Sequence, residues 1–365
     1  IDPGTGKKNY AIVQAEDELS AMGMVIGANW NGARAFTATS GPGVSLMSEF
    51  LGLAYFAEVP AVLVDVQRAG PSTGMPTRTQ QSDIFAAAYA SHGDTKHVLF
   101  FPATPAECFS MTIEAFDLAE RLQTPIIIMS DLDLGMNEWM SPPLEFDDSY
   151  RYDRGKVLTG EELEAMTERF GRYLDVDGDG IPYRTYPGAH PTKGAYFTRG
   201  SSRDEYAAYT EDGDVYVRNM DRLLKKFETA KSLVPEAKVK PAAEPTQDAL
   251  LFFGTTASPA YEALETLEKE GIHLDTLRLR SFPFTQEVED FIEEHDRIFV
   301  IEQNRDGQMR RLLLNETNVE ANAKLISVVE YDGLPVTARK IASVIRGAMG
   351  INNVTPLVPQ EKELA

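Results

Sequence analysis

Short apolar runs alternate with helical patterns between residues 10 and 131. The runs predict strands, and the segments between them have the periodicity of helices. Strands are expected at 10–14, 33–39, 59–66, 97–103 and 124–131, and helices at 17–31, 44–57, 83–91 and 104–122. Because the runs are nearly continuous rather than alternating, they indicate a parallel sheet that is covered on both faces. The pattern therefore predicts a doubly wound α/β domain.

The alternation of predicted strands and helices stops after residue 131 and resumes near residue 249. The middle of the chain is rich in tyrosine, with helices expected only near 160–172 and 214–232, and it ends in a Pro- and Ala-rich linker at 234–246. Further strands are expected near 249–254, 274–279, 297–302 and 324–330, and helices near 259–270, 286–295, 307–314 and 337–347. We expect a first domain over 1–145, an irregular excursion over 146–245, a smaller α/β domain over 246–350 and a tail over 351–365.

The amino-acid composition limits the classes of binding partner and the cellular compartment that we expect for this protein. Lys plus Arg total 35 against 56 for Asp plus Glu, and the formal charge of -21 disfavours nucleic acid and anionic membranes as partners. The single cysteine, Cys108, excludes an internal disulfide and cannot alone hold an iron–sulfur cluster or a thiolate zinc site. The sequence also lacks a long apolar run and a starting Met. We therefore expect a cytoplasmic protein whose true start lies upstream.

Two segments that follow predicted strands carry candidate chemistry. Glu16, Asp17 and Glu18 open a helix, where the helix dipole favours acids, but one carboxylate could instead point into the crevice at the strand ends. Gly41 and Gly43 precede the next helix and leave amide protons exposed at its N-terminus. Such amides suit an anion or a polar edge of a cofactor, although a purely structural turn explains the glycines equally well.

The loop at 67–83 is the most informative segment. It leaves a buried strand and runs for seventeen residues, rich in Gly, Pro, Ser and Thr, without helical or strand periodicity. Long ordered loops at strand ends are frequently functional. Arg68 directly follows the strand and could hold a substrate carboxylate by two parallel hydrogen bonds. The alternative is an arginine paired with a surface acid of this acidic protein.

Two other motifs leave their function open. Asp175, Asp177 and Asp179 begin like a calcium-binding loop, but Tyr186 stands where the bidentate glutamate belongs. They also lack the asparagine of the magnesium-diphosphate motif of thiamine enzymes, so a cluster of turns is expected and metal binding stays open. His92 lies just beyond a predicted helix and could face the same crevice, although a lone histidine is usually structural.

Four blocks of the chain resemble the alpha subunit of the 2-oxoacid:ferredoxin oxidoreductases, most closely the 2-oxoglutarate type. The blocks are residues 14–28, 37–54, 64–83 and 299–309, and the GPG and QRAGPSTGMPT sequences within them, in this order and spacing, are specific. The resemblance implies a thiamine-diphosphate enzyme with its pyrimidine-binding domain in residues 1–145 and a region similar to the transketolase C-terminal domain in residues 246–350.

The resemblance also implies the partners. A separate beta subunit would supply the diphosphate site with Mg²⁺ and a 4Fe-4S cluster, and the two subunits would form a dimer of heterodimers. Ferredoxin would accept the electrons, and coenzyme A would take the acyl group. This division is consistent with a chain that has one cysteine and no working diphosphate motif.

The resemblance assigns roles to three residues. By its spacing to the GMVIGA sequence at 23–28, Glu18 matches the family's cofactor-activating glutamate, with Glu16 as the alternative. Such a carboxyl favours the imino tautomer of the aminopyrimidine, whose nitrogen then deprotonates the thiazolium carbon. Arg68 matches the residue that holds the 2-oxoacid carboxylate, and Thr73 matches a hydroxyl beside substrate and cofactor.

The resulting prediction is oxidative decarboxylation of 2-oxoglutarate with coenzyme A to succinyl-CoA and CO2, or the reverse carboxylation in CO2 fixation by the reductive TCA cycle. Two alternatives stay open: the same reaction on pyruvate or a branched-chain acid, and a non-catalytic assembly subunit whose middle segment docks a partner. The chain also departs from the family, because no Tyr-Pro-Ile-Thr-Pro segment precedes Glu18. Either the first domain lacks its N-terminal part, which the missing Met favours, or the protein lacks a cofactor contact.

Overall fold

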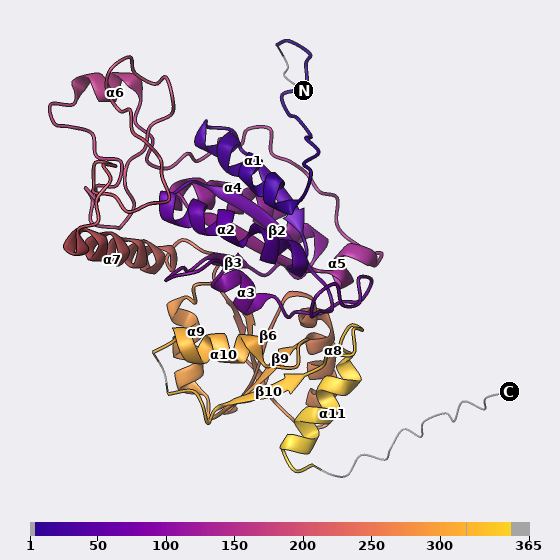
Figure 1. Ribbon diagram of the computed structural model, residues 1–365. Coiled ribbons are helices and arrows are strands. Elements are labelled where there is room, and N and C mark those ends of the chain that lie inside the picture. The colour runs from indigo at the N-terminus through magenta and orange to yellow at the C-terminus, as the bar shows by residue number, and fades with distance from the viewer. Residues whose placement is uncertain (1–3, 319, 352–365) are drawn as a thin grey trace.

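The computed structural model describes residues 4–318 and 320–351. Within them the chain forms two five-stranded sheets, one in the first part of the chain and one in the last (Figure 1). The tail expected at 351–365 lies outside the described residues except for Ile351.

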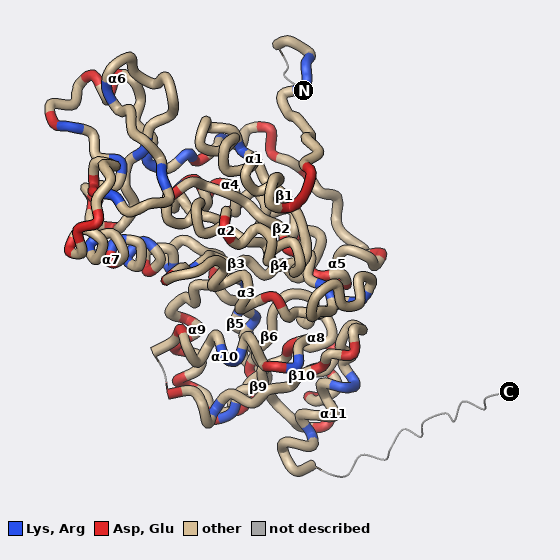
Figure 2. Tube along the Cα trace, viewed as in Figure 1, with Lys and Arg blue, Asp and Glu red and all other residues tan. Residues whose placement is uncertain are grey.

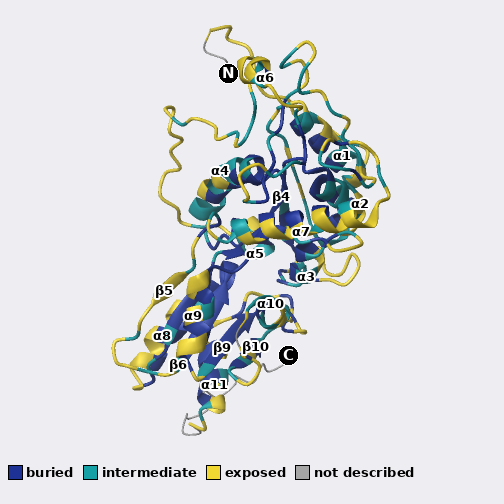
Figure 3. Cartoon of the chain, turned by 90° about the vertical axis from the view of Figure 1, so that its left-hand side faces the viewer, coloured by how far each residue is buried: buried dark blue, intermediate teal, exposed yellow. Residues whose placement is uncertain are grey.

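The first sheet has the strand order β1-β2-β4-β3-β8, with β8 antiparallel to β3 and the other pairs parallel. Its strands are β1 (Phe36–Thr39), β2 (Ala61–Gln67), β3 (Val98–Phe100), β4 (Pro125–Asp131) and β8 (Ser281–Phe282). Its helices are α1 (Glu18–Trp30), α2 (Gly41–Ala57), α3 (Ile84–Ala88), α4 (Pro105–Leu122) and α5 (Leu132–Met136). Helix α4 lies on one face, and α1 and α2 lie on the other (Figure 3). The predicted doubly wound α/β arrangement is confirmed.

The second sheet has the order β10-β9-β6-β7-β5, and only β5, which pairs with β7, is antiparallel. Its strands are β5 (Lys238–Lys240), β6 (Asp248–Phe253), β7 (Asp275–Leu279), β9 (Arg297–Glu302) and β10 (Leu325–Val329). Its helices are η1 (Gly254–Thr256), α8 (Ala257–Glu268), α9 (Gln286–Glu294), α10 (Gln308–Glu316) and α11 (Ala338–Ala348). The four strands predicted after the linker correspond to β6, β7, β9 and β10.

The strand predicted at 10–14 is wrong. This segment forms no strand in the described structure, and Ile12 and Val13 are 93% and 67% exposed. A strand needs a neighbouring strand to satisfy its backbone hydrogen bonds, and no described strand pairs with this segment. An apolar run alone therefore did not suffice to predict a strand.

The helix predicted at 160–172 is also shorter than expected. Helix α6 (Gly160–Ala165) begins with a capping box of Thr159 and Glu162 and ends where Met166 becomes extended. Farther along, Arg172 donates a hydrogen bond of 2.8 Å to the carbonyl oxygen of Glu58. The residues after α6 thus leave the helix to pack on the end of α2.

Two short strands were not predicted from the sequence. Strand β5 lies inside the segment expected to be a linker, and β8 joins the first sheet although it comes from the last third of the chain. Ser281 and Phe282 of β8 pair with Phe100 and Leu99 of β3. Consequently the two sheets are linked by backbone hydrogen bonds as well as by side chains.

The middle segment is held to the first domain by a buried ionic cluster. Helix α7 (Gly213–Ala230) places Arg222 and Lys226 against Glu58, which ends α2 in the left-handed conformation. Arg222 donates to both carboxylate oxygens of Glu58, at 2.9 and 2.6 Å, and Lys226 donates at 2.8 Å. The side chain of Glu58 is fully buried, and these bonds, together with Arg203 at 3.9 Å, compensate for its lost hydration.

None of the helices in residues 4–318 and 320–351 is both long and apolar enough to cross a bilayer.

Candidate active site

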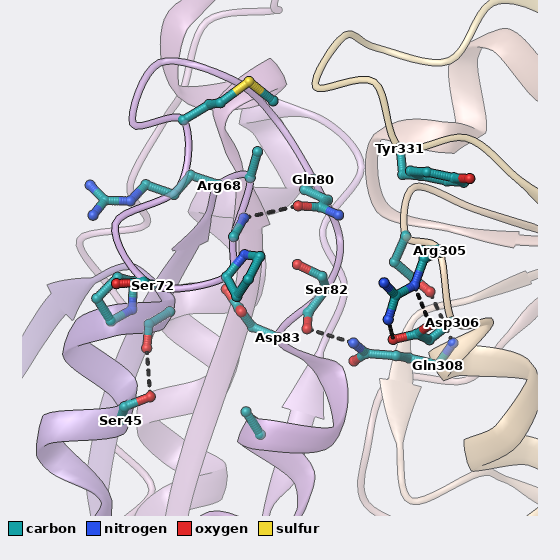
Figure 4. Close-up of a pocket in the computed structure, with 18 residues that line it drawn as sticks. Ser45, Arg68, Ser72, Gln80, Ser82, Asp83, Arg305, Asp306, Gln308 and Tyr331 are labelled. Carbon is teal, nitrogen blue, oxygen red and sulfur yellow. Dashed lines mark hydrogen bonds and ion pairs between the residues drawn. The ribbon is translucent and has the colours of Figure 1, made fainter.

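A cavity of about 540 Å³ opens beyond the carboxyl ends of β1 and β2. One wall is formed by the start of α2 and the loop after β2, and the opposite wall by residues around the start of α10 and by Tyr331 (Figure 4). Parallel α/β sheets place ligands in crevices of this kind. The two walls come from residues more than two hundred positions apart, so this cavity exists only in the folded chain.

Arg68 is the arginine of the first wall. It lies one residue beyond the end of β2 and lines the cavity, and its buried Nε atom has no hydrogen-bond partner. No ion pair or side-chain hydrogen bond of Arg68 is present among the described residues. The alternative of an arginine paired with a surface acid therefore does not hold here.

The loop after Arg68 is folded tightly on itself. The amide of Ala69 donates to the carbonyl of Arg78, and the amide of Met75 donates back to the carbonyl of Ala69. Gly74 has a φ of +50°, and a Cβ there would lie 1.8 Å from the Ala69 carbonyl oxygen. Only glycine fits this position, and the turn keeps the loop against the cavity.

Thr73 lies at the exposed tip of this loop. It does not line the cavity, whereas its neighbour Ser72 does. The structure therefore brings Arg68, but not the Thr73 side chain, to the cavity, and the role of Thr73 stays a prediction.

Glu18 lies in the first turn of α1, at the acidic stretch visible at the start of that helix (Figure 2). Of the three acids, Asp17 is the N-cap and accepts a hydrogen bond of 2.7 Å from the Ser20 amide, which lowers the pKa of Asp17. Glu16 is exposed. The carboxylate of Glu18 is half-buried and has no hydrogen-bond partner among the described residues. Capping thus explains Asp17, whereas Glu18 makes no hydrogen bond among the described residues and is favoured at this position only by the helix dipole.

The first turn of α2 lies between Glu18 and the cavity. A Cβ on Gly43 would lie 1.8 Å from Thr39 Oγ1 and 2.9 Å from Glu18 Cγ, so this glycine permits close contact with both residues. A Cβ on Gly41 would lie 2.6 Å from Asp83 Oδ1. Burial raises the pKa of Asp83 to about 6, and a hydrogen bond from the Gly41 amide acts to lower it. A protein carboxylate thus stands where the glycine turn was expected to meet an anion.

We expect Gly43→Ala to disturb this turn. The new methyl group must displace Thr39 and Glu18, at a cost of about 1–3 kcal/mol in the free energy of unfolding. Gly27→Ala is the matched control, because no atom lies within 4 Å of the added Cβ and alanine favours the helix. Chemical denaturation of both variants checks the expectation. Equal stabilities of the two variants would mean that the turn tolerates the methyl group.

Amide side chains, which the sequence reasoning missed as individual residues, form much of the contact between the two walls. Gln81 is buried, and its side-chain oxygen accepts a hydrogen bond from the backbone amide of Gln303 at 3.2 Å. Asn304 donates to the Gln81 carbonyl at 2.9 Å, and Gln308 donates to the Ser82 carbonyl at 2.7 Å. All four residues lie in two of the blocks that carry the family resemblance, Gln81 in 64–83 and the other three in 299–309.

His92 does not face this crevice, so that expectation is wrong. It lies before β3, at the opposite edge of the sheet, and lines a separate cavity with residues of the middle segment such as Tyr216. Its side chain is 86% exposed, with Glu49 at 3.7 Å.

The acidic motif at 175–180 forms turns. Asp175 accepts hydrogen bonds from the amides of Gly178 and Gly180. Lys156 contacts Asp177 at 2.7 Å and Asp179 at 2.9 Å, so an ammonium group takes the position between these carboxylates. Among the described residues no group of three His, Cys, Asp or Glu side chains is arranged to hold a metal ion.

Comparison with known proteins identifies relatives for most of this chain. Residues 3–167 match the family described as pyruvate flavodoxin/ferredoxin oxidoreductase, thiamine diphosphate-binding. The alpha subunit of 2-oxoacid:ferredoxin oxidoreductase 2 from Aeropyrum pernix is 35% identical over 347 residues, which cover 94% of this chain and 52% of the relative. The 2-oxoglutarate synthase subunit KorA from Methanothermobacter thermautotrophicus is 34% identical over 307 residues, covering 83% of this chain and 78% of the relative.

A solved structure agrees with these relatives. The 2-oxoglutarate:ferredoxin oxidoreductase from Magnetococcus marinus, with 2-oxoglutarate, coenzyme A and succinyl-CoA bound, superposes with a TM-score of 0.82 at 28% identity. The match covers 92% of this chain and 56% of that chain. The chain spans about half the length of several of the curated relatives that it matches.

Proposed function

Because this chain belongs to the alpha-subunit family of the 2-oxoacid:ferredoxin oxidoreductases, we propose that its crevice binds a 2-oxoacid and that 2-oxoglutarate is the preferred substrate. The observation that carries the proposal is Arg68. In a protein with a formal charge of -21, this arginine lines the cavity without an ion pair of its own among the described residues. A guanidinium in that state is suited to bind a substrate carboxylate through charge-assisted hydrogen bonds.

The choice of 2-oxoglutarate is supported by the relatives. The KorA relative is named a 2-oxoglutarate synthase subunit, and the solved structure of the Magnetococcus marinus enzyme contains 2-oxoglutarate. The Aeropyrum pernix relative is named only for 2-oxoacids, so pyruvate or a branched-chain acid is the second candidate substrate.

The proposed cofactor is thiamine diphosphate, and the family matched by residues 3–167 is described as binding it. When bound, thiamine diphosphate supplies a carbon nucleophile for the 2-oxo carbon of the substrate. Glu18 fits this cofactor because its carboxylate is half-buried and lacks a hydrogen-bond partner among the described residues. Glu18 also packs against the first turn of α2, where Gly43 leaves room for its side chain. Its carboxyl group would hold a proton at the ring nitrogen of the aminopyrimidine. Thr73 is proposed to act beside the substrate, from the loop that follows Arg68.

The complete reaction needs partners beyond this chain. The relatives are named as alpha subunits, which supports a beta subunit as partner. We propose that this beta subunit carries the diphosphate site, Mg²⁺ and a 4Fe-4S cluster. In the proposed reaction 2-oxoglutarate loses CO2, coenzyme A takes the succinyl group, and two electrons pass singly to ferredoxin. With a sufficiently reducing ferredoxin the same complex would run the carboxylation that fixes CO2. We propose that the complex is a dimer of heterodimers. We also propose that it is cytoplasmic, because a chain with a single cysteine suits a reducing compartment.

Substitution of Arg68 tests the substrate site. We expect Arg68→Ala, assembled with the beta subunit, to lower kcat/KM for 2-oxoglutarate by about 10- to 150-fold, because a charged hydrogen bond contributes about 1.5–3 kcal/mol. Arg68→Lys keeps the charge but loses the paired geometry, so it should fall between the wild type and Arg68→Ala. The measurement is the rate of 2-oxoacid-dependent viologen reduction.

Arg218→Ala serves as the control, because Arg218 is an exposed arginine of α7 that pairs only with Glu205. Its kinetics should match the wild type. If Arg68→Ala left both KM and kcat unchanged, the assignment of Arg68 to the substrate would be wrong.

A further inference from the structure

Two aspartates lie in the part of the first domain that forms the Arg68 wall of the cavity. Asp65 lies within β2 and is 0% exposed, and neither of its carboxylate oxygens has a hydrogen-bond partner. Asp83 lines the cavity, and its buried Oδ2 atom also lacks a partner. The two acids are neighbours in the fold, because the backbone amide of Asp83 donates to Gln67 Oε1 at 3.2 Å, and Gln67 lies two residues beyond Asp65 on the same face of β2. Together they present three buried acceptor atoms without a donor.

An ionised carboxylate can only accept hydrogen bonds, so three buried oxygens of two neighbouring carboxylates without a donor are strongly unfavourable. One proton between them removes the problem, because the protonated group then donates to the other. Across the sheet Asp65 is paired with Thr39 in β1, whose hydroxyl donates to the Ser40 carbonyl at 3.5 Å, and with Met129 in β4, which has no side-chain donor.

The remaining charged groups around the pair are accounted for. Arg68 follows the same strand and interacts with Asp83, while Glu18 contacts the far side of the α2 turn. Asp131, at the end of β4, instead accepts from the Thr255 hydroxyl and from the first amides of α5. On the opposite wall Arg305 and Asp306 pair with each other at 2.7 Å, below Tyr331 (Figure 4).

We propose that Asp65 and Asp83 share one proton and that this pair positions Arg68 for the substrate carboxylate. While the proton is held, the pair carries a single negative charge, and Arg68 stays available to the substrate. When the proton is lost, two negative charges beside Arg68 compete for its guanidinium and repel the incoming anion. The effect on Arg68 rests on the proposed function, whereas the shared proton does not.

The titration of the pair has a defined direction. Burial raises the pKa of Asp83 to about 6, although Arg68 and the Gly41 amide act to lower it. Burial, and then the charge of Asp83, raise the pKa of Asp65 well above its usual value. The pair therefore loses its last proton above the range in which ordinary aspartates ionise.

Asp65→Asn separates a titrating pair from a structural one. The asparagine amide donates to Asp83 permanently, so the variant keeps the bond but has no proton to lose. In the complex with the beta subunit we expect the wild-type KM for 2-oxoglutarate to rise by up to about tenfold per pH unit at the alkaline end of a series from about pH 6 to about pH 9. In Asp65→Asn, KM should stay flat over the same range. A merely structural role would change KM by one factor at every pH, and an unchanged pH slope in the variant would overturn the proposal.

Infrared spectroscopy of the same complex tests the shared proton independently of activity. Near neutral pH the wild type should show a protonated-carboxyl band in addition to any from Asp131, whose pKa burial raises to about 6, and this additional band should disappear in both Asp65→Asn and Asp83→Asn. Asp147→Asn is the control, because Asp147 is exposed and the pKa of its carboxyl is lowered by Ser149. Loss of the band in the pair variants supports the shared proton even if another acid proves to be the substrate. A band that persists in both variants would contradict it.

Discussion

We expect Glu18→Gln to lower kcat by about 10²–10⁴-fold, the usual contribution of a positioned acid–base group. Glutamine has the size of glutamate but cannot exchange a proton with the cofactor. Because Glu18 has no hydrogen-bond partner among the described residues, the substitution removes no internal bond, and thermal stability should stay close to that of the wild type. The measurement is viologen reduction with saturating 2-oxoacid by the complex with the beta subunit.

Glu16→Gln is the matched variant for Glu18. Glu16 is exposed two residues earlier, and it is the alternative that the sequence left open. Its kcat should equal that of the wild type. If Glu16→Gln were inactive and Glu18→Gln active, the catalytic role would belong to Glu16. Full activity in both variants would show that neither carboxyl activates the cofactor.

The second large effect is expected in stability. Glu58→Ala should lower the free energy of unfolding by about 3–5 kcal/mol, because it leaves Arg222 and Lys226 buried without their carboxylate. Burial lowers the pKa of Lys226 to about 8, so Arg222, which bonds both oxygens, is the principal partner. Chemical denaturation of the full chain measures the change.

Two comparisons interpret that measurement. Glu228→Ala breaks an exposed pair with Lys231 on the same helix and should cost less than about 1 kcal/mol. A similar small loss in Glu58→Ala would show that the cluster contributes little.

Burial acts to raise the pKa of Glu58, but Arg222 and Lys226 hold it well below its usual value. This contribution is therefore complete above the pKa of an unfolded glutamate and is lost as the pH falls below it, and Glu58→Gln should lack that acid dependence.

The parts of the fold that were predictable are those in which local pattern and tertiary context agree. The buried runs of β2 and β4 and the capped helix α4 follow from apolar periodicity and from the Thr104 cap, whose hydroxyl accepts the Glu107 amide at 3.2 Å. Strand pairing was not predictable at 10–14, because an apolar run does not show whether a neighbouring strand exists. Strand β8 was missed for a different reason: two residues carry no pattern, and their partner, β3, comes from the first part of the chain.

The residues of the candidate site were likewise predictable only in part. Arg68 and the glycine turn were found because they follow β2 and β1, and the carboxyl ends of parallel strands share one edge. Glu18 follows the strand predicted at 10–14, which does not form, and its assignment came from the family resemblance. Asp65 was overlooked, although an acid inside a buried apolar strand is itself a signal. Its neighbour Asp83 comes from beyond the loop, and no local pattern could place the two together. The expectation for His92 failed because it lies before β3, which puts it at the opposite edge of the sheet.

The most direct test of the account is the rate of viologen reduction by the complex of this chain with its beta subunit and coenzyme A, measured with 2-oxoglutarate, pyruvate and 2-oxoisovalerate. The account predicts that kcat/KM is highest for 2-oxoglutarate and falls with Arg68→Ala. A preference for another acid would keep the 2-oxoacid site and overturn the substrate. No reduction with any of the three acids, in a complex shown to contain thiamine diphosphate and its cluster, would contradict the central claim and favour an assembly subunit.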